Sequence, residues 1–263
     1  MSTLNIAAVQ YDIKWLDKPA NFTALEALVN DHLSTHGAVD LLLLPETFST
    51  GFCLQDVSVS EAQDGGADLS WMQAQAKQHR CVVAGTVFVR QGDKKANRFY
   101  WVSPDGSVAY YDKRHLFRLG NEGDYVVQGR MRKVFEIKGI RILPQVCYDL
   151  RFPVWSRNRQ DYDLMVNVAN WPAARRHVWD ILLKARAMEN QVYVVGVNRV
   201  GEDGLGVAHS GGSCVLDYVG EPLVSAEDDS QAVIRSELDF SALEQFKRDF
   251  PAFLDADEFD LEQ

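Results

Sequence analysis

The chain has 263 residues, of which 46% are hydrophobic and 24% charged, and its formal net charge at pH 7 is −10. These proportions are typical of a globular protein with enough apolar area for a sizeable core. The acidic balance, with a pI near 5.1, argues against nucleic acid or an anionic membrane surface as the main partner, because both require a basic face. An anionic small molecule would then need a local cluster of arginines.

No linker-like stretch or shift of composition divides the chain, so we favour one domain over residues 1–263 rather than two, with an acidic tail of about 15 residues at its end. The start has no charged segment followed by an apolar leader, and no apolar run approaches the length of a membrane span. We therefore expect a cytoplasmic protein. The four cysteines lie far apart without a C-x-x-C pair, which suggests neither a zinc knuckle nor a disulfide framework.

The first half of the chain alternates predicted strands and helices. Short apolar runs predict strands at residues 4–9, 39–44 and 81–89, and apolar residues at three- and four-residue steps predict helices at 17–34 and 71–79. Residues 97–102 and 107–111 predict a hairpin around a Pro-Asp-Gly turn. His32 and His36 are four residues apart, as helical metal ligands would be. A solvated helix end is the better interpretation, because the glutamate of H-E-x-x-H is missing.

The second half continues the same pattern. Predicted strands lie at 134–146, turned at Gly139, and at 163–169, 191–197, 213–216, 222–224 and 232–238, and helices at 176–190 and 242–250. Residues 118–130 form a long charged loop, which inside a compact domain is more often functional than idle. Residues 198–206 form a glycine-rich loop. The order of elements predicts an α/β fold with mixed sheets.

Three reactive side chains stand at the ends of predicted strands: Glu46, Lys113 and Cys147. Cys147 lies at a strand-to-helix junction, where free N–H groups and the helix dipole favour a thiolate and where Asp149 can cap the following turn. Each residue also has an ordinary interpretation. Cys147 can be a core cysteine, Glu46 a cap or a solvated acid, and Lys113 a surface lysine.

At these residues the chain resembles the nitrilase, or carbon–nitrogen hydrolase, superfamily, whose catalytic residues are Glu, Lys and Cys in that order. The matching segments are spread over nearly the whole chain: Leu44–Phe52, Asp112–Phe117, Val146–Pro153, Asn167–Pro172 and Ala185–Tyr193. Within the superfamily the chain is most similar to the ω-amidases, which hydrolyse the side-chain amides of 2-oxoglutaramate and 2-oxosuccinamate. The resemblance implies a four-layer α-β-β-α sandwich and a homodimer.

The resemblance also implies a role for each matching residue. Glu46 corresponds to the general base, Lys113 to the lysine that stabilises the oxyanion, Cys147 to the nucleophile, and Glu122 to a second glutamate that orients lysine and substrate. The chain departs from the pattern at Gly212, where many relatives carry an acid or a histidine. No metal or organic cofactor is required, because the thioester route splits amide hydrolysis into two easier steps.

The remaining expectations concern the substrate. The backbone N–H of Tyr148 is a second oxyanion donor, and Trp171 follows a strand end beside the motifs. A substrate carboxylate needs cations near the pocket. We therefore expect at least one of Arg118, Arg175 and Arg176 to bind it, and we expect Arg151 to have a structural role. The alternatives are a nitrile or N-carbamoyl hydrolase of the same superfamily, or a binding protein without turnover.

Overall fold

Two six-stranded sheets form the centre of the computed structural model, which describes residues 3–261. In spatial order the first sheet contains β14 (Ala232–Asp239), β1 (Thr3–Gln10), β2 (Leu41–Leu43), β3 (Val82–Gln91), β4 (Lys94–Val102) and β5 (Val108–Asp112). The second contains β13 (Pro222–Ser225), β12 (Cys214–Leu216), β9 (Tyr193–Asn198), β8 (Leu164–Ala169), β7 (Ile140–Val146) and β6 (Phe135–Ile137). Both sheets mix parallel and antiparallel pairs, as expected.

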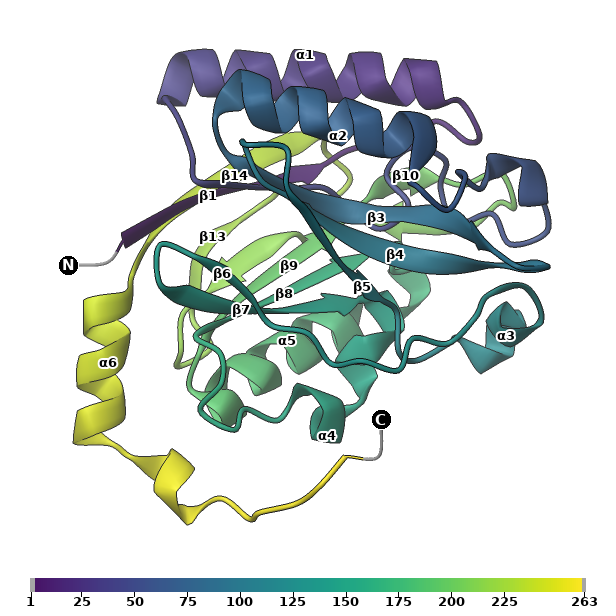
Figure 1. Ribbon diagram of the computed structural model, residues 1–263. Coiled ribbons are helices and arrows are strands. Elements are labelled where there is room, and N and C mark those ends of the chain that lie inside the picture. The colour runs from purple at the N-terminus through teal and green to yellow at the C-terminus, as the bar shows by residue number, and fades with distance from the viewer. Residues whose placement is uncertain (1–2, 262–263) are drawn as a thin grey trace.

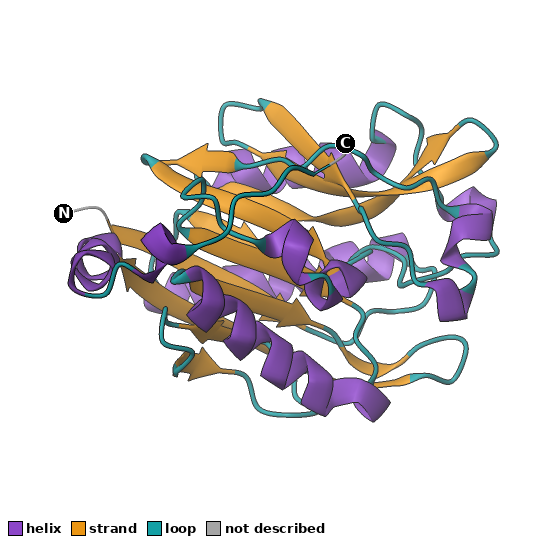
Figure 2. Cartoon of the chain, turned by 90° about the horizontal axis from the view of Figure 1, so that it is seen from below, coloured by secondary structure: helices purple, strands orange, loops and turns teal. Residues whose placement is uncertain are grey.

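Helices cover the outer face of each sheet. Figure 1 shows α1 (Lys18–His36) and α2 (Gly66–His79) above the first sheet, and α5 (Arg176–Asn190) below the second. Seen from below, the long helix in front of the strands is α5 (Figure 2). The shorter helices are α3 (Glu122–Tyr125), α4 (Pro153–Ser156) and α6 (Phe240–Asp249). The predicted α-β-β-α sandwich in one domain is therefore confirmed.

Alternation along the strands builds three cores between the four layers. In β1, Leu4 and Ile6 face the second sheet, whereas Ala7 and Val9 pack against α1 and α2. In β8, Val166 joins the core between the sheets and Met165 joins the core beneath α5. Because both faces of each sheet are covered, the strands carry the near-continuous apolar runs that made them recognisable.

Three elements differ from the sequence-based expectation. Helix α2 begins at Gly66 rather than at residue 71. Its start is marked by Gly65, which has a left-handed backbone conformation, and its first turn lacks the apolar repeat that predicts a helix. The loop at 198–206 is partly a hairpin of β10 (Val200–Glu202) and β11 (Ala208–Ser210). The long loop at 118–130 includes helix α3. Within residues 3–261, no helix is long and apolar enough to span a membrane.

Candidate active site

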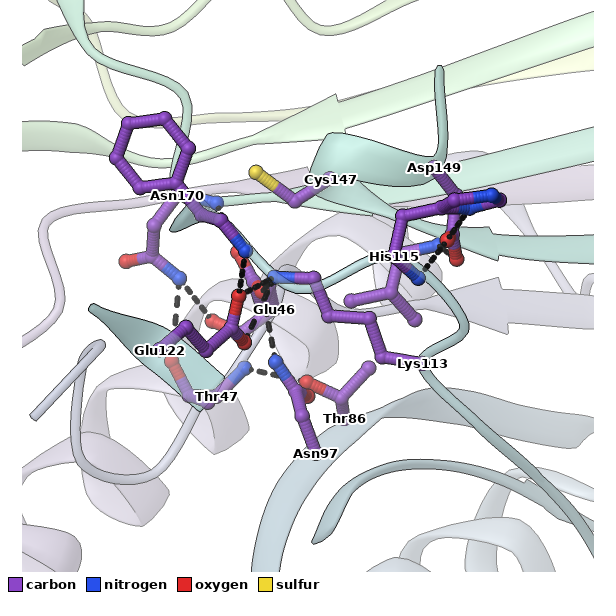
Figure 3. A network of polar contacts seen from close by, with 12 residues as sticks. Glu46, Thr47, Thr86, Asn97, Lys113, His115, Glu122, Cys147, Asp149 and Asn170 are labelled. Carbon is purple, nitrogen blue, oxygen red and sulfur yellow. Dashed lines mark hydrogen bonds and ion pairs between the residues drawn. The ribbon is translucent and has the colours of Figure 1, made fainter. Parts of the chain in front are cut away.

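Strand ends from both sheets meet at one site. Glu46 follows β2 and Lys113 follows β5 of the first sheet, while Cys147 and Asn170 follow β7 and β8 of the second. Figure 3 shows Cys147 beside the group formed by Glu46 and Lys113. The three side chains expected to act together are thus brought together, at the sheet edge where α/β proteins usually bind ligands.

Glu46 is held from three directions. Its Oε1 accepts hydrogen bonds from Nδ2 of Asn97 at 2.8 Å and from Nζ of Lys113 at 3.2 Å, and its Oε2 accepts one from the backbone N–H of Asn170 at 2.8 Å. Only 1% of Glu46 is exposed. The residue after it, Thr47, has φ +45° and donates its N–H to Oγ1 of Thr86. A left-handed, β-branched residue is strained, and such strain is concentrated at functional sites.

Lys113 lies between two carboxylates. Its Nζ is 3.0 Å from both oxygens of Glu122, and Oε2 of Glu122 also accepts the backbone N–H of Phe117 at 2.6 Å. Burial alone would lower the pKa of Lys113, but the charges of Glu122 and Glu46 outweigh it and raise that pKa above its ordinary value. Lys113 is therefore a buried cation, and Glu122 lies where it was expected, against the lysine.

Cys147 begins a short 3-10 helix, η3 (Cys147–Arg151), with φ +47°. Asp149 holds this turn. Its carboxylate accepts the N–H of Val146 at 3.0 Å, the hydroxyl of Tyr111 at 2.8 Å and the N–H of His115 at 2.8 Å. The expectation that Asp149 caps the segment after it was wrong, because the side chain turns back toward β7 and the loop of Lys113. The lysine loop and the cysteine turn therefore share one anchor.

The expected thiolate at Cys147 was also wrong. Burial raises the pKa of the Cys147 thiol well above its ordinary value, and the carboxylate of Glu46 raises it further, while Lys113 opposes both. The helix that follows the cysteine has a single turn, so its dipole is small. The resting group is a neutral thiol beside a carboxylate, which requires a base to take its proton during attack.

A pocket of about 370 Å³ opens above these groups. Glu46, Lys113, Cys147, Tyr148 and Trp171 all line it. Tyr148 is the second residue of η3, so its N–H has no acceptor within the helix and is free to serve a ligand. Most of the remaining wall is apolar and comes from several loops: Phe52, Leu54, Phe117, Leu119, Pro172, Leu205 and Val207.

Two arginines line the pocket, Arg151 and Arg175. The guanidinium of Arg151 lies 5.2 Å from the ring centre of Trp171, and that of Arg175 lies 5.2 Å from the ring centre of Phe117. Neither makes an ion pair with any residue from 3 to 261. Aromatic stacking leaves the hydrogen-bonding edge of a guanidinium unused, so both can receive an anion.

The expectations for the other arginines need correction. Arg151, expected to be structural, lines the pocket, where its guanidinium stacks on Trp171. Arg118 is exposed and does not line the pocket, whereas its neighbours Leu119 and Gly120 do. Arg176 is held by Asp180 at 2.8 Å and Asp228 at 2.7 Å, away from the pocket.

Sequence reasoning missed several residues of the site. Asn97, which binds Glu46, is a buried amide inside β4, and a polar residue within an apolar strand was the available signal. Asp203 and His209 also line the pocket. They lie on the β10–β11 hairpin, where the glycines made the segment look like a plain loop. In the described part of the chain, no group of three or more His, Cys, Asp or Glu side chains is placed to hold a metal ion.

Known proteins are similar to this chain over nearly its whole length. The family model described as carbon-nitrogen hydrolase matches residues 5–248. The chain belongs to the carbon–nitrogen hydrolase family. The chain is 44% identical to the omega-amidase YafV of Yersinia enterocolitica, covering 98% of this chain and 99% of that protein. It is 31% identical to the 2-oxoglutaramate amidase of Bacillus subtilis, covering 95% and 96% of the two chains.

A solved structure is also similar over its full length. A CN-hydrolase superfamily protein of Xanthomonas campestris, with an arsenic adduct in its active site, superimposes with a TM-score of 0.94 and 41% identity. The alignment covers 99% of this chain and 100% of that one. The layers described above are thus those of a carbon–nitrogen hydrolase.

In this carbon–nitrogen hydrolase, the surroundings of Gly212 explain why the position carries a glycine. The residue has φ +85°, and a Cβ built there would lie 2.3 Å from the guanidinium carbon of Arg176. The arginine therefore occupies the space that a side chain at 212 would need. The backbone carbonyl of Gly212 still accepts the indole N–H of Trp179 at 2.8 Å. Gly212 does not line the pocket of Glu46, Lys113 and Cys147.

Proposed function

We propose that this protein is an ω-amidase, which hydrolyses the terminal amide of short dicarboxylic monoamides such as 2-oxoglutaramate to the acid and ammonia. The observation that carries the proposal is a single pocket with two kinds of group. A thiol, a carboxylate and a buried ammonium line it together with two guanidiniums, which have no ion-pair partner among residues 3–261. Relatives named for this activity at 44% and 31% identity support it.

In the first half-reaction, the sulfur of Cys147 attacks the amide carbon while Glu46 takes the thiol proton. The negative charge that develops on the carbonyl oxygen is stabilised by Nζ of Lys113 and the N–H of Tyr148. Glu46 then delivers the proton to the departing nitrogen. The carbon–nitrogen bond breaks, ammonia leaves, and the acyl group remains on Cys147 as a thioester.

In the second half-reaction, Glu46 removes a proton from a water molecule that attacks the thioester carbon. The carbon–sulfur bond breaks, the acid product leaves, and the proton returns to the sulfur of Cys147. Lys113 stabilises the oxyanion again. Glu122 holds Lys113 in place through its two 3.0 Å contacts and keeps it charged. The raised pKa of the Cys147 thiol fits this cycle, since the base and not a resting thiolate starts the reaction.

The carboxylate of the substrate binds Arg151 and Arg175. A protein with a net charge of −10 would repel a dianion or monoanion at long range, so local cations are needed to capture it. The planar guanidinium can bond both carboxylate oxygens at once. This contact fixes one end of the molecule, and Cys147 selects the amide at the other end.

We also propose that the active protein is a homodimer. On α5, Ile181 and Met188 are exposed and seven residues apart, so they lie on the same face of the helix. Val219 and Leu223 are also exposed, and a Cβ at Gly220 would meet the side chain of Met188 at 3.1 Å, which places this turn beside α5. Together they form an apolar surface on the outer face of the second sheet.

The direct test of the activity is ammonia release from a panel of small molecules. The purified protein should hydrolyse 2-oxoglutaramate with a kcat/KM at least roughly tenfold above that of an uncharged amide of the same length, because only the acid binds the arginines. Nitrile and N-carbamoyl analogues serve as the comparison. Higher kcat/KM for either analogue would assign the protein to another branch of the family, and no ammonia from any compound would contradict the proposal.

A further inference from the structure

Lys95 is a buried lysine close to the active site that the mechanism does not use. It lies on β4 and is only 1% exposed. Within residues 3–261 the lysines that form ion pairs are others, so the ammonium of Lys95 has no carboxylate partner there. Burial lowers the pKa of this ammonium below its ordinary value. A buried charge without a counterion is costly, so its other contacts must compensate for the lost water.

The contacts of Lys95 hold one backbone segment in place. Its Nζ donates hydrogen bonds to the carbonyl of Cys53 at 2.7 Å and to the carbonyl of Asp56 at 3.1 Å. The same atom lies 4.4 Å from the ring centre of Phe88. An ammonium has three N–H donors, so two carbonyls and one aromatic face use all of them. Lys95 therefore ties the segment 53–56 to β4.

The residues next to these carbonyls form part of the pocket wall. Phe52 and Leu54 both line the pocket. The ring centre of Phe52 lies 5.0 Å from Nζ of Lys113 and 5.9 Å from the ring centre of Phe88. One aromatic pair therefore lies between two buried ammonium groups, with Lys95 against Phe88 and Lys113 against Phe52. Leu54 packs in a small cluster separate from the three cores between the layers, so this part of the wall depends on local contacts for its position.

The backbone of Lys95 supports the other neighbour of Lys113. Its carbonyl accepts the N–H of Val127 at 2.8 Å, just after α3. The first residue of α3 is Glu122, which contacts Nζ of Lys113. Lys95 is therefore bonded to both segments beside the catalytic ammonium, through its backbole to the segment with Glu122 and through its side chain to the segment with Phe52.

We propose that Lys95 is a positioning residue, which holds the ring of Phe52 against the ammonium of Lys113. The inference rests on the role proposed above for Lys113 as an oxyanion donor. An aromatic face attracts a cation, and a ring in this place keeps water from one side of it. An oxyanion donor is most effective where it is fixed before the reaction and water is excluded. Lys95 thus acts on the amide end of the substrate and not on its carboxylate end.

The experiment is a double-mutant cycle on Lys95 and Phe52. Both kcat and KM are measured for an amide that the wild type hydrolyses, in the wild type, Lys95→Met, Phe52→Leu and the double variant, with circular dichroism to show that each is folded. We expect kcat to fall roughly three- to tenfold in each single variant, because the contact of the ring with the ammonium is weakened. The double variant should lose little more, since both changes remove the same contact. Lys95→Gln, which keeps N–H donors on a shorter side chain, is the second variant for the same cycle and should lose less.

The matched control is Lys77→Met, at an exposed position of α2 outside the pocket, and its kcat should stay at the wild-type value. The loss in Lys95→Met should be equal for 2-oxoglutaramate and for an uncharged amide, because the arginines are not changed. Additive losses in the double variant, or an unchanged kcat in folded Lys95→Met, would overturn the role of Lys95 and leave the proposed function intact. Absence of ammonia from every amide with the wild type would contradict the proposed function and this inference together.

Discussion

At the residue scale, the centre of the site is one buried cation, the ammonium of Lys113, which is surrounded by two carboxylates and a thiol. Lys113 lies between Glu46 and Glu122, and its raised pKa keeps it charged through the cycle. Cys147 remains protonated at rest, so the timing of attack depends on Glu46. In the proposed function the carboxylate of the substrate binds separate groups, the guanidiniums of Arg151 and Arg175, which line the pocket. Reaction and recognition therefore use different side chains.

This separation predicts a selective effect of removing the guanidiniums. Arg151→Ala and Arg175→Ala should each raise KM for 2-oxoglutaramate by roughly ten- to a hundredfold, because a charge-assisted hydrogen bond is lost. The KM for an uncharged amide should change much less. Steady-state kinetics on both substrates measure this, with Arg118→Ala as the control, since Arg118 is exposed outside the pocket. Equal effects on the charged and uncharged substrates would show that these arginines do not bind the carboxylate.

Individual residues were predictable to different degrees. Glu46, Lys113 and Cys147 could be selected because each follows a strand, and strands of one direction end at the same edge. The arginines could not be sorted in the same way. Arg151 and Arg176 differ only in whether an acid or an aromatic ring lies within reach, and that depends on residues distant in sequence. The hydrogen bond from His115 to Asp149 could not be predicted for the same reason.

At the scale of elements, the start of α2 contains a buried acid. Asp68 lies in the first turn, is 1% exposed, and contacts Nζ of Lys18 at 3.0 Å. Its Oδ1 is buried without a partner in the described chain. Burial raises the pKa of Asp68 from 3.8 to about 6, although Lys18 opposes the shift. The folded state therefore binds this proton more tightly than the unfolded state does.

The consequence is a pH-dependent contribution to stability. Because the pKa of Asp68 is higher in the folded protein, its contribution is fully present below about pH 4 and is lost as the pH rises through about 6. Asp68→Asn removes this titration. Denaturant unfolding at pH 4 and pH 7 should show the wild type losing up to about 3 kcal/mol relative to the variant. Parallel pH profiles for the two proteins would contradict the assignment.

Most elements could be predicted because burial on both faces left long apolar runs, and the predicted bounds of α5 match the structure. The β10–β11 hairpin could not. Its strands have three residues each and its turn contains glycines, so the alternation of apolar and polar residues is too short to predict a strand. The hairpin is defined by tertiary contacts instead, through Arg199 and the backbone of Tyr11.

At the scale of the whole molecule, the apolar surface around Ile181 and Met188 predicts self-association. Sedimentation velocity at micromolar concentration should show a dimer, and Ile181→Glu should shift the protein toward the monomer, because a buried charge without a partner is costly. Val108→Glu, a half-exposed position on β5 in the other sheet, is the matched control and should remain dimeric. A monomeric wild type would contradict the proposal of a homodimer.

The central claim is that Cys147 carries the acyl group during hydrolysis of a dicarboxylic monoamide. The measurement is the rate of ammonia release from 2-oxoglutaramate by the wild type and by Cys147→Ala, with circular dichroism to show that both are folded. We predict turnover by the wild type and a rate at least roughly a thousandfold lower for the variant, because the nucleophile is lost. A folded Cys147→Ala protein that released ammonia at a rate near the wild type's would contradict the account.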